Sequence, residues 1–217
     1  MVIAIDGPAG SGKSTIAKML AEKLTGKDGK SFTYINSGNI YRTITFGCLR
    51  AEIDLSDSGK VIEFAKDISV IMDKDQVFLN EEDVSPFLHT DEIDKYSAPL
   101  SAIVPVRHIV NDLIRSISKG RNIIVEGRDM TTVVFPDTPY RFYLDASADS
   151  RAKRRYDQNV SNLGLDEIKT AILSRDEIDM NKKEGSLKIA EGVQYLDTSD
   201  LTIIQVYDRL KERIESK

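Results

Sequence analysis

Residues 2–14 read VIAIDGPAGSGKS, an apolar run that leads into a glycine-rich stretch and a lysine. Residues 2–5 are apolar at both odd and even positions, which is typical of a strand buried on two faces. Residues 7–14 fit the spacing G-x-x-x-x-G-K-[ST], and apolar residues three and four apart over 14–24 predict a helix directly afterwards. Strand, loop and helix in this order indicate a phosphate-binding loop, although an ordinary glycine turn fits the same spacing.

Such a loop favours a cluster of anionic oxygens, because its glycines let successive N–H groups point inward and the helix adds its positive dipole end. We expect Lys13 to reach the β- and γ-phosphates of a nucleoside triphosphate, and the Ser14 hydroxyl to complete the shell of a bridging Mg²⁺ ion. The residues predicted to bind the triphosphate here are Gly7, Pro8, Ala9, Gly10, Ser11, Gly12, Lys13, Ser14 and Thr15.

The rest of the chain alternates short β-branched runs with longer helical patterns. Further strands are predicted at residues 32–36, 122–126, 140–144 and 193–197. Helices are predicted at residues 14–24, 39–51, 106–119, 149–159, 166–182 and 202–216. This alternation predicts an α/β fold of three layers around a five-stranded parallel sheet, and the glycine-rich motif makes it a P-loop fold.

The rhythm changes between about residues 55 and 105. The runs at 68–72 and 76–79 flank Asp73, Lys74 and Asp75, which indicates a hairpin, and residues 82–85 add a third short antiparallel strand. We therefore expect a single domain over residues 1–217 with an inserted small antiparallel β lobe on the parallel core.

Composition excludes several other classes of protein. The 217 residues are 41% hydrophobic and 30% charged, as in soluble globular proteins, and the net charge of −5 argues against binding of polymeric nucleic acid. No apolar run approaches the length of a membrane span, and the first residues lack an export signal, so we expect a cytoplasmic protein. Cys48 is the single cysteine, which excludes a multi-cysteine zinc site. Size and the lack of an apolar face predict a monomer.

Two arginines follow strands where ligands gather in open parallel sheets. Arg42 ends the stretch SGNIYR after the second strand, and Arg128 lies in EGRD after the third. Bringing a polyphosphate next to a second dianion costs about 4 kcal/mol for each pair of unit charges 4 Å apart, so fixed cations are required. We expect Arg42 and Arg128 to converge on one anion beside the loop. The alternative is that each is a solvated surface arginine.

Two further clusters lie in the last third of the chain. Residues 150–155 read SRAKRR, and their arginines predict a mobile lid, over about 150–185, that closes on the triphosphate. A solvated helical face is the alternative. Arg175, Asp179 and Lys182 share one face of a helix, where an ordinary surface ion pair is also possible.

Taken together, these segments resemble the bacterial-type cytidylate kinases, within the P-loop nucleoside monophosphate kinase superfamily. The resemblance lies in residues 7–15, 36–42, 126–130, 133–137, 145–147 and 175–176. It implies an ATP-dependent transfer of the γ-phosphoryl group to CMP or dCMP, with Mg²⁺, and an inserted lobe on the monophosphate side. Kinases for UMP, AMP or dephospho-coenzyme A, and a non-catalytic nucleotide-binding sensor, remain alternatives.

The resemblance also implies a role for individual residues. It places Arg151, Arg154 and Arg155 on the lid and the donor nucleotide, and makes Lys13, Arg128, Arg154 and Arg155 the catalytic set. It places Arg42, Arg128 and Lys182 on the acceptor phosphate, with Ser37 and Tyr41 framing that site. It assigns Arg107 and Asp129 to the cytosine ring, and Arg175 and Asp179 to the sugar.

The sequence departs from the family pattern at several of these places. Asn36 replaces an aspartate beside the phosphate-binding loop, and Lys182 replaces an arginine, which exchanges a two-pronged donor for a point charge. Thr131, Ile178 and Ser186 replace a glycine, an arginine and a proline. The base-reading serine of the family has no assigned counterpart, because Ala98 lies at its position between Ser97 and Ser101.

Overall fold

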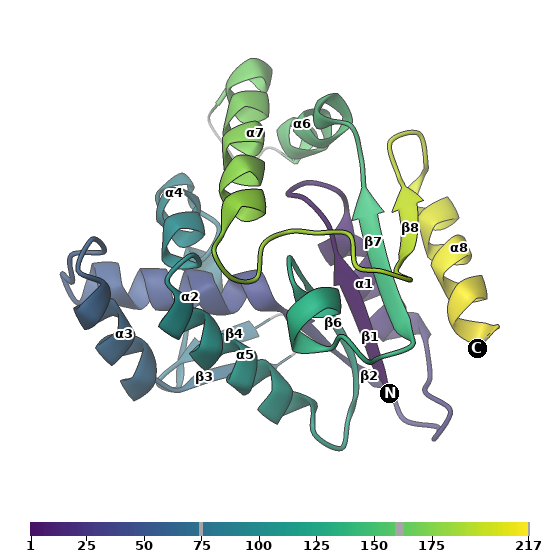
Figure 1. The fold of residues 1–217 in the computed structure, drawn as a ribbon, viewed down its shortest axis with the longest axis horizontal. Coiled ribbons are helices and arrows are strands. Elements are labelled where there is room, and N and C mark those ends of the chain that lie inside the picture. Colours follow the sequence, from purple (N-terminus) through teal and green to yellow (C-terminus); the bar gives the residue numbers. More distant parts are fainter. Residues whose placement is uncertain (74–75, 159–162, 217) are drawn as a thin grey trace.

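A computed structural model describes residues 1–73, 76–158 and 163–216 of the chain. Its central sheet has five parallel strands in the order β2-β6-β1-β7-β8 (Figure 1). The strands are β1 (Val2–Asp6), β2 (Phe32–Asn36), β6 (Asn122–Gly127), β7 (Tyr140–Asp145) and β8 (Gln194–Asp197). The predicted α/β fold is confirmed, and every strand of this sheet lies within one residue of its predicted bounds.

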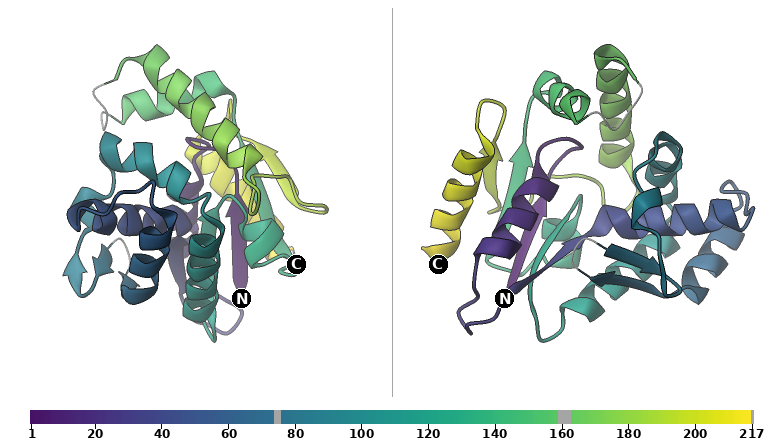
Figure 2. Two further views of the ribbon diagram at one scale, coloured as in Figure 1. Left: turned by 60° about the vertical axis from the view of Figure 1, so that its left-hand side comes forward. Right: turned by 180° about the vertical axis from the view of Figure 1, so that it is seen from behind.

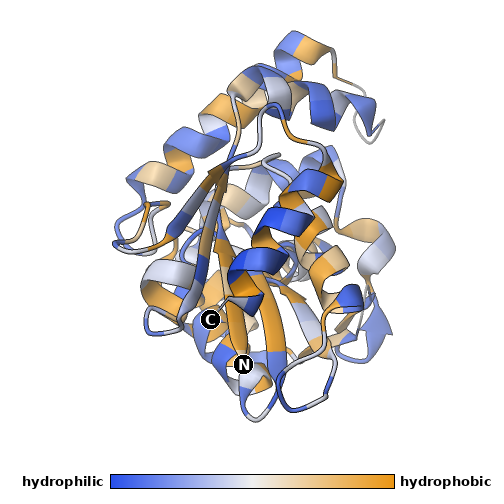
Figure 3. Cartoon of the chain, turned by 90° about the vertical axis from the view of Figure 1, so that its right-hand side faces the viewer, coloured by the Kyte–Doolittle hydropathy of each residue, from blue (hydrophilic) through white to orange (hydrophobic). Residues whose placement is uncertain are grey.

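Helices cover both faces of the sheet, because the strands are apolar on both. Ile3 and Ile5 pack toward α1 (Lys13–Lys23) and α8 (Ile203–Glu215), whereas Ala4 packs into the opposite cluster. That second cluster joins the sheet to α2 (Ser37–Arg50) and α5 (Val104–Ser118). In Figure 3 the inner strands of the central sheet are largely orange, while α8 alternates blue and orange, as expected for a helix half in water.

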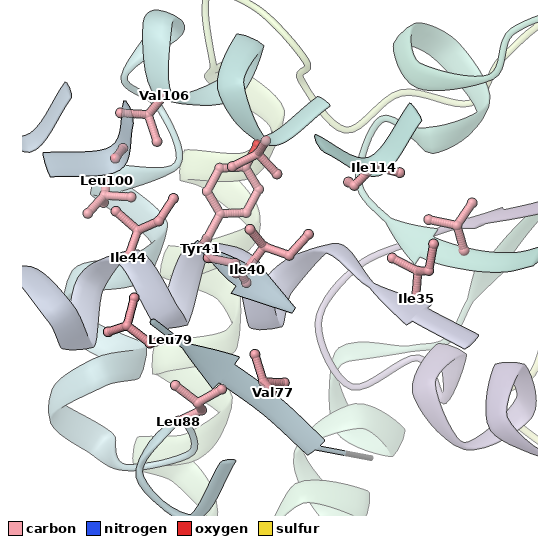
Figure 4. Close-up of a cluster of buried hydrophobic side chains, with 14 of the residues drawn as sticks. Ile35, Ile40, Tyr41, Ile44, Val77, Leu79, Leu88, Leu100, Val106 and Ile114 are labelled. Carbon is pink, nitrogen blue, oxygen red and sulfur yellow. The ribbon is translucent and has the colours of Figure 1, made fainter. Parts of the chain in front are cut away.

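The inserted lobe packs against α2. It contains a three-stranded antiparallel sheet of β3 (Val70–Asp73), β4 (Gln76–Leu79) and β5 (Glu82–Asp83), which confirms the predicted hairpin and third strand. The turn residues Lys74 and Asp75 lie outside the described residues. Figure 4 shows Val77, Leu79 and Leu88 of the lobe gathered around Ile40 and Ile44 of α2.

The lobe also contains two helices that the sequence analysis did not predict, together with a short 3₁₀ turn η1 (Ser85–Phe87). They are α3 (Ser58–Asp67) and α4 (Asp91–Leu100). The Asp57 side chain accepts from Lys60 N at the start of α3, and the Thr90 hydroxyl accepts from Ile93 N at the start of α4. The lobe is therefore mixed rather than purely β.

Two helices lie over the carboxyl ends of the central strands, at the top of Figure 1. They are α6 (Ala148–Asp157) and α7 (Leu165–Asn181), which pack on each other through Ala152, Ile168 and Ile172. The left view of Figure 2 shows α7 leaning across the sheet edge toward the lobe. The predicted end of the first of these helices, at residue 159, lies outside the described residues. No helix in the described ranges meets the length and hydropathy that a bilayer span requires.

Candidate active site

A cavity of about 850 Å³ lies at the carboxyl end of the sheet, between the phosphate-binding loop, α2, the lobe helix α4 and the helices α6 and α7. Lys13, Arg42 and Arg128 all line it. The structure therefore brings the predicted donor side and the predicted acceptor side into one cavity.

The phosphate-binding loop has the strained backbone that its glycines predict. Gly7 has φ +149°, and a Cβ there would overlap the carbonyl oxygen of Leu144. The Lys13 ammonium curls back over the loop and donates to Pro8 O at 2.7 Å. Burial, reinforced by the charge of Arg128, lowers the pKa of Lys13 to about 7.

Glu126 lies at the end of β6, directly below this loop. Its Oε1 accepts from Ser14 Oγ at 2.5 Å and from Tyr34 OH at 3.0 Å. Asn36 does not reach Glu126: its Nδ2 donates to Tyr34 OH at 3.2 Å, and its Oδ1 accepts from Asn39 N at the start of α2. The anionic oxygen beside Ser14 therefore comes from Glu126.

The hydroxyl of Ser14 and the carboxylate of Glu126 are oxygen donors of the kind that fits Mg²⁺. The ion needs hard oxygen donors, keeps several waters, and takes one or two carboxylates in addition to substrate phosphates. Within the described residues there is no group of three or more His, Cys, Asp or Glu side chains arranged for a metal. A site of one hydroxyl and one carboxylate therefore depends on the phosphates of a ligand to complete it.

Arg128, Lys182 and Asp179 form one buried cluster on the acceptor side. Asp179 Oδ2 accepts from Arg128 Nε at 2.7 Å, and Asp179 Oδ1 accepts from Lys182 Nζ at 2.6 Å. Burial by itself raises the pKa of Asp179, but Arg128 and Lys182 outweigh it and hold this pKa well below its usual range. Asp179 thus holds in place two of the cations that the resemblance assigns to the acceptor phosphate.

A second cluster joins Arg42, Arg155 and Arg175 around the carboxylate of Asp94 on α4. Burial, with the charges of Arg42 and Arg128, lowers the pKa of Arg175 to about 10. Arg175 Nε is buried and has no hydrogen-bond partner among the described residues. This buried donor is therefore available to an oxygen atom of a ligand.

Arg107 and Asp129 form a buried ion pair deeper in the cavity, with Arg107 Nη2 2.5 Å from Asp129 Oδ2. Arg107 also donates to Ser101 O at 2.8 Å and to Gly185 O at 3.3 Å. The hydroxyl of Tyr41 lies in the same region and has no partner among the described residues. Burial raises the pKa of Tyr41, so its hydroxyl remains protonated and able to donate.

Asp6 connects the two sides of the cavity. Its fully buried carboxylate accepts from Met130 N, Thr131 N and Thr131 Oγ1 at 2.9, 2.7 and 2.6 Å. These groups begin η2, a π-helical turn over Met130–Val134 whose preceding residue Asp129 makes no side-chain cap. Asp6 therefore satisfies the first two N–H groups of η2 and leaves the Asp129 carboxylate available to Arg107.

The arginines of α6 divide between the loop and the cavity. Arg151 lies behind the loop, where it donates to Ala9 O at 3.0 Å and to Asp176 Oδ2 at 2.6 Å, and it does not line the cavity. Arg154 lines the cavity and donates to Thr198 Oγ1 at 3.1 Å. Its pKa is lowered by burial. Arg155 turns toward Asp94.

The remaining predicted site residues lie as follows. Ser37 lines the cavity and donates to the backbone oxygen of Glu126 at 2.8 Å. The cavity wall includes Ala9, Gly10, Ser11, Gly12, Ser14 and Thr15 of the loop, but not Gly7 or Pro8. Ser97, Ala98 and Ser101 all line the cavity, and the Ser101 hydroxyl donates to Ala98 O at 2.7 Å.

Glu126 and Asp94 line the cavity but were not predicted as site residues from the sequence. Glu126 had a signal, since an acid ends an otherwise apolar, fully buried strand. Asp94 had none, because its contacts join residues 52 to 81 positions away along the chain.

Comparison with known proteins identifies the family to which the chain belongs. A family model described as cytidylate kinase matches residues 3–216. A cytidylate kinase of Caldanaerobacter subterraneus subsp. tengcongensis is 42% identical over 216 residues, which cover 98% of this chain and 93% of the relative. One of Fusobacterium nucleatum is 38% identical over 218 residues, which cover 99% of this chain and 97% of the relative.

The fold also resembles that of a solved shikimate kinase from Bacteroides thetaiotaomicron. The TM-score is 0.52 at 13% identity, and the alignment covers 99% of this chain and 98% of the other. At this identity the likeness concerns the fold alone.

Proposed function

Because the chain belongs to the cytidylate kinase family, we propose that it transfers the γ-phosphoryl group of ATP to CMP or dCMP, giving ADP and CDP or dCDP. The observation that carries this proposal is the shared cavity, in which a phosphate-binding loop faces clustered arginines from α2, α6, α7 and the loop after β6, together with Lys182 directly after α7. A site that only holds a triphosphate has no need of the second set of cations.

On the donor side, the loop N–H groups and Lys13 bind the β- and γ-phosphates, and Arg154 covers them from α6. Burial disfavours the charged ammonium form of Lys13, and a triphosphate bound beside it favours that form. When bound with ATP, Mg²⁺ neutralises phosphate charge in the transition state. Ser14 and Glu126 are the residues that would hold the ion.

On the acceptor side, Arg42, Arg128 and Lys182 hold the phosphate of the monophosphate. No protein general base is required, because a phosphate monoester has its second pKa at about 6 and is largely ionised at neutral pH. These residues therefore act by positioning and by charge neutralisation, which are the main sources of catalysis in phosphoryl transfer.

For the base, we propose that Arg107 and Asp129 contact the cytosine ring. Asp129 accepts from the exocyclic amino group, where uracil presents a carbonyl oxygen and leaves the carboxylate facing a lone pair. We assign Arg175 and Asp179 to the sugar; Arg175 also contacts Asp94, and Asp179 also contacts Arg128.

The proposal is tested by measuring ADP release from ATP and Mg²⁺ with CMP, dCMP, UMP, AMP or dephospho-coenzyme A as acceptor. We expect turnover with CMP and dCMP at least one hundredfold faster, in kcat/KM, than with the other three. Preferred turnover of another acceptor would contradict the assignment of the base. Slow hydrolysis that no acceptor stimulates would instead favour a nucleotide-binding sensor.

A further inference from the structure

One carboxylate, that of Asp94, receives arginines from three different helices. Arg42 of α2 donates to Asp94 Oδ1 from Nε at 3.0 Å and from Nη2 at 2.9 Å, and Arg175 of α7 donates to the same oxygen at 3.4 Å. Arg155 of α6 donates to the other oxygen, Oδ2, at 2.9 Å. Asp94 itself comes from α4 of the inserted lobe.

The two arginines that bind different oxygens of Asp94 also belong to different proposed substrate sites. Arg42, on Oδ1, belongs to the proposed acceptor side, whereas Arg155, on Oδ2, belongs to the proposed donor side. The two carboxylate oxygens therefore fix how far apart these guanidinium groups lie. That separation matters for in-line transfer, because the reacting phosphates must meet within about 3 to 3.5 Å.

Charge balance explains why an acid is needed at this place. Arg42, Arg155 and Arg175 carry three positive charges within one carboxylate's reach, and in its absence they repel one another. The side chain of Asp94 is only 21% exposed, so water screens this repulsion weakly. Burial raises the pKa of Asp94, but Arg42 and Arg175 outweigh it and keep the carboxylate ionised.

We propose that Asp94 is a positioning residue of the reaction: it holds Arg42 and Arg155 at the separation that brings the transferred phosphoryl group and the acceptor phosphate together. This inference rests on the proposed kinase function. It assigns to the inserted lobe a part in catalysis, exerted through the arginines and not by contact with substrate.

The test is Asp94→Asn, which keeps the shape and removes the charge. Three N–H donors point at Oδ1 and one at Oδ2, so the amide settles with its oxygen toward Arg42 and Arg175 and its NH₂ group toward Arg155. Arg155 is then released while Arg42 keeps its partner. We expect kcat with saturating ATP and CMP to fall at least tenfold, and the KM for CMP to change less than threefold.

Glu92→Gln is the matched control, because Glu92 is an exposed acid on the same helix and does not line the cavity. Its kcat should equal that of the wild type. Combining Asp94→Asn with Arg155→Ala completes the test, since the two changes act through one contact. The loss of kcat in the double variant should be clearly smaller than the product of the two single losses.

Two outcomes overturn the proposal. An unchanged kcat with a lower KM for CMP means that Asp94 merely competes with the acceptor phosphate for Arg42. A lower melting temperature with unchanged kinetic constants means that the ion pairs only stabilise the fold. Failure of the proposed function itself is seen separately, as a wild-type protein that does not phosphorylate CMP.

Discussion

At the residue scale, the burial of Lys13 disfavours its charged form. Because burial lowers the pKa of Lys13 to about 7, most Lys13 side chains are neutral at pH 8, whereas a bound triphosphate favours the ammonium form. We therefore predict that binding of Mg·ATP takes up most of a proton at pH 8 and far less at pH 6, because Lys13 is neutral only above its lowered pKa. Calorimetric titrations in Tris and in HEPES measure this uptake, because the observed enthalpy changes with the ionisation enthalpy of the buffer.

Lys13→Met serves as the control for this titration, since it removes the titrating group. Any binding that it retains should show the same enthalpy in both buffers. Equal enthalpies for the wild type at pH 8 would show that Lys13 is already charged without its ligand.

Arg128 is the cation that best tests the acceptor site. It is held by Asp179 at 2.7 Å and lines the cavity with Lys13. Arg128→Ala removes a charge-assisted hydrogen bond to the acceptor phosphate and leaves Asp179 with Lys182 alone. We predict that kcat/KM for CMP falls at least tenfold, measured by steady-state ADP release. Arg121→Ala, at an exposed position outside the cavity, should leave kcat/KM unchanged, and a similar result for Arg128→Ala would exclude it from the site.

Some of these residues were recognisable from the sequence, and others were not. Lys13 and Ser14 follow from a motif whose geometry is local, and Arg128 follows from its place after a buried strand. Asp94 depends on how the lobe docks against α6 and α7, which no local pattern encodes. Arg151 was predicted to contact the donor nucleotide, but it lies behind the loop and donates to Ala9 O. A basic cluster predicts the charge of a segment but not which of its guanidinium groups turns toward the backbone of the loop.

At the scale of elements, the segment after α7 packs against Arg107 and Asp129, the pair proposed to contact the base. Gly185 has φ +61°, and an added Cβ there would overlap both the Arg107 guanidinium and the Asp129 carboxylate. We predict that Gly185→Ala raises the KM for CMP at least tenfold and changes the KM for ATP less than twofold, as measured by initial rates with each substrate varied. The reason is that the pair must shift to make room.

The matched control is Gly120→Ala. Gly120 has φ +72°, and an added Cβ there meets nothing within 4 Å. It therefore imposes a similar backbone strain without the overlap, and its KM for CMP should be that of the wild type. Equal effects of the two variants on this KM would refute the steric explanation.

The elements themselves differ in how well the sequence predicts them. The strands of the central sheet are apolar on both faces, so their bounds are clear. The helix α4 was missed because Pro99 and four polar or charged residues among its first five interrupt the apolar pattern. Thr90, with Asp91 and Glu92 in the first turn, was the available signal for its start. For α3, the strand pattern of the neighbouring hairpin obscured a short amphipathic run.

At the scale of the whole molecule, the charge distribution is uneven. The chain carries a net charge of −5, yet its main cavity gathers Lys13, Arg42, Arg128, Arg175 and Lys182. The net charge therefore bears on solubility and on binding to polymeric nucleic acid. The local arrangement of cations in the cavity instead favours binding of small anions.

We predict that the protein is a monomer in solution. The most exposed apolar side chains on the described surface are distributed among several elements, such as Ile204 on α8, Ile189 after α7 and Met180 on α7, at 67%, 58% and 52% exposure. Sedimentation velocity should give one species near the chain mass of 24.3 kDa. A concentration-dependent shift to twice that mass would contradict this prediction.

The carboxylate of Asp6 has a consequence for any attempt to redesign this protein for another nucleobase. Asp6 is the last residue of β1, directly before the phosphate-binding loop, and it also anchors the turn that follows Arg128 and Asp129. A substitution that moves this turn to admit a purine pulls on the same anchor. Engineers who retune acceptor preference should therefore expect ATP affinity to drift with it, unless the three hydrogen bonds of Asp6 are preserved.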